Sequence, residues 1–149
     1  MTERHPMSQA QLRLWAIYRR LYQRLFGVRP GVHAEDTKHI HFGEDIHVSP
    51  GVRIVTVDHD PRDPSRTFPV EPVTIGDHCV LGSNCTILPG VALGPHTTVG
   101  AGAVVTESYP EGYVVLVGNP ARVMRQMKPC EDCAGPGCAN CDGTGVRFV

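Results

Sequence analysis

The sequence lacks an apolar run long enough to cross a bilayer, because no stretch of its 149 residues approaches the ~18 apolar residues that a spanning helix needs. The first ten residues also lack the apolar core of a secretory signal, which predicts a cytoplasmic protein. The formal net charge of −1 argues against a general nucleic-acid-binding protein. Charged residues make up only 19% of the chain and hydrophobic residues 41%, so the composition is not that of a disordered tail.

Glycine and proline are abundant instead, with 16 and 13 residues. Frequent turns with little charge between them favour many short elements over a helical bundle. A single domain of this length buries roughly 70% of its unfolded surface, so a true core is expected. Charge is uneven, since residues 1–30 hold six arginines and one acidic residue.

An amphipathic helix is predicted over residues 8–26. Ser8 and Gln11 fit a capping box, and Gly27 is expected to end the helix. Apolar and aromatic residues recur at helical spacing, with arginines at the other positions. Such a helix packs on its own domain or on a sister subunit, or else its basic face and aromatic residues lie on a membrane surface as a peripheral contact.

A repeat of six residues runs through most of the chain, and internal repeats determine architecture. The repeated aliphatic or aromatic residues are Phe42, Val48 and Ile54, then Ile75, Leu81, Ile87, Leu93, Val99 and Val105, with Val117 and Val123 in the same phase. Glycine follows at Gly43, Gly76, Gly82, Gly94, Gly100 and Gly118. Small or aliphatic residues also recur two positions earlier, among them Cys79, Cys85 and Val115.

A six-residue unit is too short for a pair of helices, but it suits a short strand followed by a tight turn. Three such units form one coil, and stacked coils bury a continuous apolar column. Glycine permits the close or left-handed backbone that each corner requires. Cys79 and Cys85 are then expected to be packing residues of the core.

Tandem segments such as VTIGDH, CVLGSN and VALGPH, with the closing VGNPARV, resemble the left-handed parallel β-helix acyltransferases. The stretch VDHDPRDPSRTFPVEPVTIGDHCVLGSNCTILPGV is similar to the branch containing galactoside and maltose acetyltransferases and polysaccharide O-acetyltransferases. The resemblance covers about residues 32–127. It implies an all-β fold, a left-handed β-helix (31–128) with a loop (58–72). Two parts fall outside the resemblance: the predicted N-terminal helix (1–30) and a C-terminal cysteine knuckle (129–149).

One loop interrupts the repeat, because the spacing from Ile54 to Ile75 is not a multiple of six and the segment 58–72 leaves the coil. Long ordered loops are usually functional, and four prolines stiffen this one. His59 lies at its base, where an imidazole can take and return a proton near neutral pH. In the resembled family the histidine at this place is the general base, so the resemblance gives that role to His59.

The resemblance also implies a donor site for acetyl-coenzyme A in a groove between neighbouring subunits of a homotrimer. Backbone groups there bind the pantetheine arm, and basic residues bind the phosphates, for which the planar guanidinium is well suited. The matching positions are Ser83, Ala101, Thr106, Gly118, Arg122 and Arg125. His78 and His96 are one coil apart and are expected to form a solvated row at one corner.

The expected activity is transfer of an acetyl group to a hydroxyl of a sugar or glycan. An N-acetyltransferase or serine acetyltransferase-like enzyme is the alternative, although the latter needs a larger N-terminal helical domain than the residues before Ile40 provide. Carbonic-anhydrase-like chemistry needs a His-x₄-His pair that the sequence lacks. A non-catalytic scaffold that docks through the knuckle predicts no effect of replacing His59.

Two adjacent copies of Cys-x-x-Cys-x-Gly-x-Gly, CEDCAGPG and CANCDGTG, resemble the zinc-binding knuckles of DnaJ-type chaperones. Four thiolates at two tight turns suit one tetrahedral structural Zn²⁺, held by Cys130, Cys133, Cys138 and Cys141. Redox-active thiols or disulfides are the alternative. A closed site of this kind has a structural or protein-binding role.

Overall fold

The computed structural model describes residues 32–34, 37–131, 138, 141 and 144–149. The chain divides into two units, Met1–Pro30 and Gly31–Val149. The first unit, with the helix predicted over 8–26, lies outside the described residues. The described part has a single 3₁₀ turn, η1 (Thr37–His39), and none of its helical segments is long and apolar enough to cross a bilayer.

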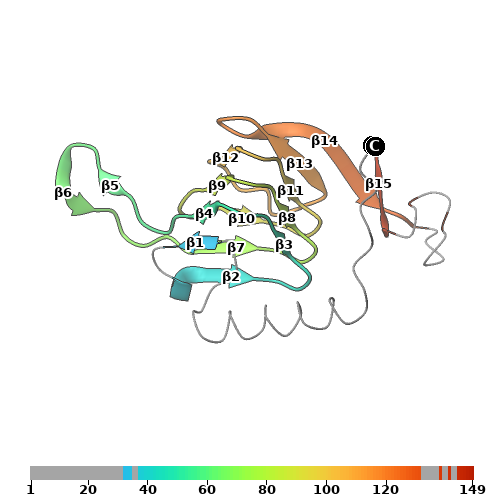
Figure 1. The fold of residues 1–149 in the computed structure, drawn as a ribbon, viewed down its shortest axis with the longest axis horizontal. Helices are drawn as coiled ribbons and strands as arrows, with labels where there is room; N and C mark the ends of the chain where they lie inside the picture. Colours follow the sequence, from blue (N-terminus) through green and yellow to red (C-terminus); the bar gives the residue numbers. More distant parts are fainter. Residues whose placement is uncertain (1–31, 35–36, 132–137, 139–140, 142–143) are drawn as a thin grey trace. The chain divides into compact units, whose positions relative to one another are not determined.

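The remaining elements are short strands that wind repeatedly around one axis (Figure 1). The chain enters with β1 (Val32–Ala34) and makes its first coil with β2 (Ile40–Phe42), β3 (His47–Val48) and β4 (Val52–Ile54). A hairpin, β5 (His59–Asp60) and β6 (Asp63–Thr67), follows. The second coil is β7 (Val73–Ile75), β8 (Val80–Leu81) and β9 (Thr86–Ile87), and the third is β10 (Ala92–Leu93), β11 (Thr98–Val99) and β12 (Val104–Val105). The chain ends with β13 (Val114–Val117), β14 (Arg122–Pro129) and β15 (Val146–Phe148).

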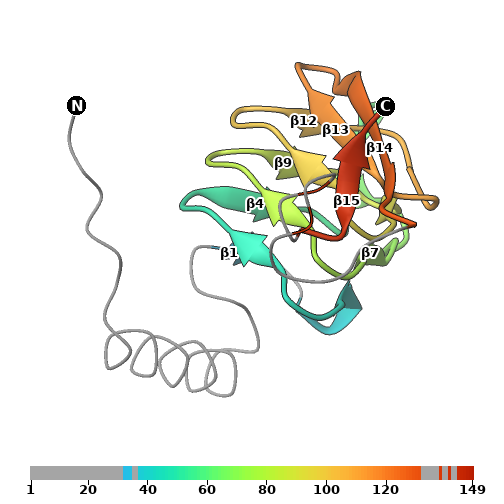
Figure 2. The ribbon, with the colours of Figure 1, turned by 90° about the vertical axis from the view of Figure 1, so that its right-hand side faces the viewer.

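The coils stack into three parallel sheets. Sheet A has the order β1-β4-β9-β12, and Figure 2 shows these strands one above another. Sheet B is β10-β7-β2, and sheet C is β3-β8-β11-β13, extended by the antiparallel strands β14 and β15. The predicted all-β parallel coil is therefore confirmed for the described residues. The left-handed sense of the coil stays a prediction.

The register reproduces the repeat read from the sequence. Ile87 pairs with Val105 of the following coil and with Ile54 of the preceding one. The sequence spacing to Ile54 is wider because the segment 58–72, which contains the hairpin, lies between the two coils. The repeated aliphatic residues from Ile54 to Val105 are all buried, and so are Cys79 and Cys85 two positions earlier in their repeats. These two inward rows form the continuous apolar column that stabilises the stack.

Two positions at each corner meet different backbone requirements: one adopts a positive φ, and the other allows close approach of the next coil. The residue that adopts a positive φ recurs with the period of the repeat: Asp45, Gly51, His78, Asn84, Gly90, His96 and Gly102. The glycine directly after the aliphatic residue serves close approach instead. A Cβ on Gly82 would lie 2.6 Å from the backbone nitrogen of Ala101 in the next coil. In the coils before β13 the left-handed backbone therefore lies two positions after these glycines, whereas Gly118 itself adopts a positive φ.

The last coil departs from the predicted phase. Val99 pairs with Leu116, which comes one position too early for a full coil, and Leu116 is fully buried. The shortening lies directly after β12: Tyr109, which pairs with Leu93, follows Val105 by four positions, whereas Leu93 follows Ile87 by six. Val115 and Val117 are consequently only half-buried, and Val123 is exposed on the antiparallel β14. The prediction that Val117 and Val123 continue the core was wrong.

Candidate functional site

The hairpin β5–β6 carries His59 away from the coils (Figure 1). In the chain the hairpin follows β4 of sheet A and precedes β7 of sheet B. At its base the amide of Phe68 donates to the carbonyl of Asp58 at 2.8 Å. His59 is exposed, and its amide donates to the Asp58 carboxylate at 2.7 Å. Within the described part of the chain no hydrogen bond reaches the imidazole ring, so the ring is available to a ligand.

Asp60 fixes the shape of the hairpin rather than the orientation of the imidazole. Its carboxylate accepts from Arg62 Nε at 2.8 Å and Nη2 at 2.8 Å, and from the Arg62 amide at 2.9 Å. These bonds hold the pKa of Asp60 below its usual range. His59 is exposed and Asp60 buried because neighbouring residues of a strand point to opposite faces.

Three of the predicted donor contacts meet at the corner between sheets C and A. Ser83 and Ala101 occupy it in successive coils, and the amide of Gly102 donates to the Ser83 carbonyl at 2.9 Å. Gly118 follows in the last coil with a φ of 96°, and its carbonyl accepts from the amide of Val104 at 3.0 Å. Ser83 is half-buried, whereas Ala101 and Gly118 are exposed.

Thr106 lies on the opposite side of sheet A, in the exposed turn that follows β12. Arg122 reaches the same turn, because its Nη2 is 3.3 Å from a carboxylate oxygen of Glu107, and its Nη1 donates to the carbonyl of Ala121 at 2.8 Å. Arg125 lies farther along β14, opposite Val115 of sheet C. The two guanidinium groups therefore have different surroundings.

Arg125 stacks on an aromatic ring that the sequence did not single out. Its Cζ lies 4.9 Å from the ring centroid of Phe148 on β15. Glu107, the partner of Arg122, was also missed, although its place directly after Thr106 could have indicated it. No periodicity or motif relates Phe148 to Arg125, because their contact depends on the pairing of β15 with β14.

His78 and His96 stack at the corner between sheets B and C, with ring centroids 4.8 Å apart. Tyr113 extends the stack at 5.0 Å from His96, and Asp45 lies 3.8 Å from His78. Burial and the neighbouring His78 lower the pKa of His96, against the opposing effect of Asp77. The expected row of stacked rings is therefore present, with His78 exposed and His96 and Tyr113 half-buried.

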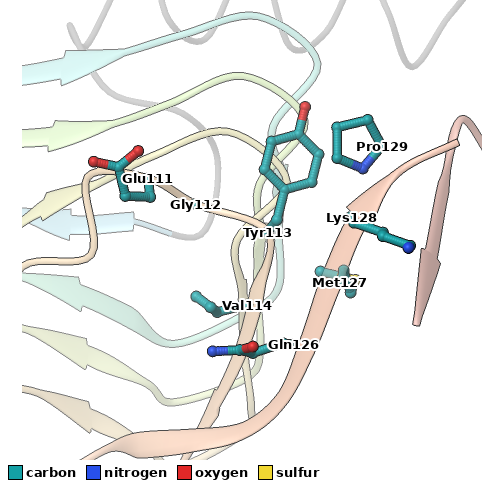
Figure 3. Close-up of a pocket in the computed structure, with 8 residues that line it drawn as sticks. All are labelled: Glu111, Gly112, Tyr113, Val114, Gln126, Met127, Lys128 and Pro129. Atoms are coloured by element: carbon teal, nitrogen blue, oxygen red, sulfur yellow. The ribbon is translucent and has the colours of Figure 1, made fainter. Parts of the chain in front are cut away.

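Two concavities adjoin this stack. A groove of about 480 Å³ lies between His78, His96 and the segment Thr144–Val146. A smaller cavity of about 280 Å³ is lined by the turn before β13, including Tyr113, and by β14. Figure 3 shows the Tyr113 ring rising from the turn on one side, with Met127 and Pro129 of β14 on the other. Neither concavity is lined by a predicted site residue.

The cysteines of the tail form a compact cluster. The sulfurs of Cys130, Cys138 and Cys141 all lie within 4.8 Å of one another, and those of Cys130 and Cys138 are 3.9 Å apart. Tetrahedral Zn²⁺ with Zn–S bonds of about 2.3 Å separates its sulfurs by about 3.8 Å, so the spacing fits. Cys133, the fourth predicted ligand, lies outside the described residues.

The electrostatics of the cluster also fit a cation. Burial and the thiols of Cys141 and Cys138 raise the pKa of Cys130 to about 12, so this thiol by itself keeps its proton at neutral pH. A divalent cation displaces such protons because it stabilises the thiolates. Cys79 and Cys85, by contrast, are buried in the solenoid core as expected, and burial raises the pKa of Cys85 to about 11.

Comparison with known proteins supports the resemblance. Residues 72–107 match the family model described as hexapeptide repeat of succinyl-transferase. A Saccharomyces cerevisiae protein named YJL218W, a candidate acetyltransferase, is 38% identical over 87 residues, covering 56% of this chain and 43% of that protein. A 2,3,4,5-tetrahydropyridine-2,6-dicarboxylate N-acetyltransferase of Staphylococcus aureus is 37% identical over 90 residues, covering 60% of this chain and 34% of that enzyme. The chain thus spans less than half the length of these relatives.

Solved structures agree with the sequence comparison. A galactoside acetyltransferase in complex with coenzyme A superposes with a TM-score of 0.61 at 25% identity, covering 83% of this chain and 74% of that one. The predicted resemblance to hexapeptide-repeat acetyltransferases is confirmed.

Proposed function

We propose that this protein transfers an acetyl group from acetyl-coenzyme A to a hydroxyl of a sugar or glycan. The observation that carries the proposal is the hairpin inserted into a hexapeptide coil, which presents the exposed imidazole of His59. The similarity to a galactoside acetyltransferase that binds coenzyme A supports both the donor and a sugar acceptor.

In the proposed reaction His59 acts as general base. The acceptor hydroxyl attacks the thioester carbonyl of acetyl-coenzyme A while the imidazole removes its proton. A backbone N–H stabilises the tetrahedral oxyanion, which collapses to the ester and releases the coenzyme A sulfur. The imidazolium returns the proton to that sulfur, so the enzyme is regenerated. General base catalysis of this kind contributes about 10²–10⁴-fold to the rate.

The donor is proposed to lie along sheet A. Ser83, Ala101 and Gly118 line the corner before this sheet, and Thr106 lies in the turn after it. Exposed or half-buried backbone at these corners can bind the pantetheine arm. Arg122 and Arg125 are proposed to bind the phosphates, since both guanidinium groups belong to the exposed strand β14.

The active unit is proposed to be a homotrimer in which two subunits share each site. The support within one chain is that His59 stands off from the coils on a hairpin, while the donor corners belong to the coils themselves. A hairpin so placed can reach the corner residues of a neighbouring copy.

Transfer to an amine is the second candidate. The Staphylococcus aureus relative is named an N-acetyltransferase, and its match covers 60% of this chain. The same base and donor site serve either acceptor, because only the group that loses its proton differs.

Zinc is proposed as a structural ion of the tail, bound by Cys130, Cys138 and Cys141 together with Cys133. The 3.9 Å spacing of two sulfurs supports tetrahedral coordination. Metal analysis of the purified protein tests this directly, with one zinc per chain expected. A Cys141→Ser variant should lose the metal, and an unchanged zinc content in that variant would contradict the assignment.

The test of the activity is release of the coenzyme A thiol from acetyl-coenzyme A across a panel of galactosides, maltose, glycans and amines. We expect turnover with a sugar hydroxyl and an ester product by mass spectrometry. Turnover confined to amines would favour N-acetylation. Failure to bind coenzyme A at all would favour the scaffold, in which the solenoid serves assembly and the knuckle serves docking.

A further inference from the structure

The strand β15 places an aromatic ring against a basic residue of the proposed donor site. Phe148 pairs with Met127 across the β14–β15 ladder, and the Arg125 Cζ lies 4.9 Å from its ring centroid. The Phe148 side chain is 60% exposed. Burial therefore does not explain why a large aromatic residue stands here, and its ordered contact is with the guanidinium.

Stacking of this kind restricts an arginine without occupying its hydrogen-bond donors. The ring contacts the flat face of the guanidinium, and the N–H groups around the edge stay free for an anion. Arg122 differs, because it is engaged by Glu107 at 3.3 Å. Within the part of the chain that the structure describes, Arg125 forms no ion pair.

We propose that Phe148 is a positioning residue that holds the Arg125 guanidinium ready for a phosphate of coenzyme A, which rests on the proposed function. Without the ring, the long exposed side chain of Arg125 samples many rotamers, and binding a phosphate has to order it. Phe148 touches neither the donor nor the acceptor and acts only through Arg125.

The cysteine cluster controls whether β15 can provide this ring. The amide of Cys130, directly after β14, donates to the carbonyl of Gly145 at 2.8 Å. Thr144 Oγ1 lies 2.6 Å from the carbonyl oxygen of Cys141 and 3.0 Å from that of Val146. A metal bound to both Cys130 and Cys141 therefore links the end of β14 to the residues that precede β15. Metal binding in the tail is thereby coupled to donor affinity.

The test compares the KM for acetyl-coenzyme A in two Phe148 variants. Phe148→Leu keeps an apolar residue but removes the aromatic face, and its KM should rise about 2- to 5-fold with kcat unchanged. Phe148→Trp retains a face for the guanidinium and should restore the KM of the unaltered protein. Val149→Ala, at a residue 76% exposed just after β15, is the matched control and should change neither constant.

A phosphate-free donor separates positioning from general damage. S-acetyl-pantetheine lacks the phosphates, so Phe148→Leu should leave its kinetics unchanged. In an Arg125→Ala background Phe148→Leu should add nothing, because residues that act through one another are not additive. Removal of the metal by a chelator should raise the KM for acetyl-coenzyme A in the unaltered protein and not in Phe148→Leu.

Several results would overturn the inference. An unchanged KM in Phe148→Leu, with coenzyme A still bound in calorimetry, would refute the role of Phe148 and leave the acetyltransferase intact. An equal loss with S-acetyl-pantetheine would show that the ring serves stability alone. If the unaltered protein binds no coenzyme A, the proposed function fails and this inference fails with it.

Discussion

Shortening a single inward side chain tests how the stacked coils are held together. Ile87 is fully buried in the middle coil, between Ile54 of the coil before and Val105 of the coil after. Replacing it with alanine removes three carbons from the column, which costs about 2.4 kcal/mol in transfer free energy at ~0.8 kcal/mol per methylene.

The cavity left by this change cannot close easily. Backbone hydrogen bonds join β9 to both neighbours, with Val55 N donating to Ile87 O at 2.9 Å and Leu88 N donating to Val105 O at 3.0 Å. These bonds fix the spacing between coils, so the surrounding residues do not collapse into the space. We therefore expect the free energy of unfolding to fall by about 4 kcal/mol, in the upper part of the range for such substitutions.

Urea unfolding at one fixed protein concentration measures the change. Thr86→Ala is the matched control, because Thr86 is the half-buried neighbour on the same strand and carries an outward side chain. Its cost should stay below about 1 kcal/mol. Equal costs for the two variants would refute the inward column as the source of stability.

Two further predictions concern ionisable groups. Cys79 and Cys85 should resist a thiol reagent at pH 8 until the protein unfolds, because a pKa of about 11 leaves Cys85 about one part in a thousand ionised; prompt labelling of both would contradict their burial. Arg62→Gln should raise the pKa of Asp60 in an NMR titration, since the Arg62 guanidinium holds it below 3.8. The Asp60–Arg62 pair should stabilise the hairpin above pH 3.8, and this effect should be lost as the pH falls through the lowered pKa of Asp60. An unchanged Asp60 titration in the variant would contradict both predictions.

The middle coils could be predicted because one physical rule governs them. Each six-residue unit must point one aliphatic residue inward, so the spacing of Ile75, Leu81 and Ile87 determines both strand and register. The rule failed in the last coil, because no following coil stacks on it and fixes which of its residues point inward. Tyr109 follows Val105 by four positions, whereas Leu93 follows Ile87 by six, and Leu116 replaces Val117 in the core. A shortened corner of this kind is not encoded in hydrophobic spacing.

The candidate site was predictable where it follows the repeat. Ser83 and Ala101 are one coil apart in the sequence and meet at one corner in the structure. The loop was recognised because it breaks the period, but the bidentate bonding of Asp60 to Arg62 depends on the hairpin geometry. The contact of Arg125 with Phe148 could not be foreseen, because it arises from an antiparallel pairing that no local pattern specifies.

Turnover of acetyl-coenzyme A by a His59→Ala variant is the decisive measurement for the proposed general base. His41→Ala is the control, because His41 is likewise an exposed histidine, on β2, and lies outside the proposed site. We expect kcat to fall about 10²–10⁴-fold in His59→Ala with coenzyme A affinity and thermal unfolding unchanged, and no fall in His41→Ala. Equal turnover in the two variants would contradict the assignment of His59 as the base.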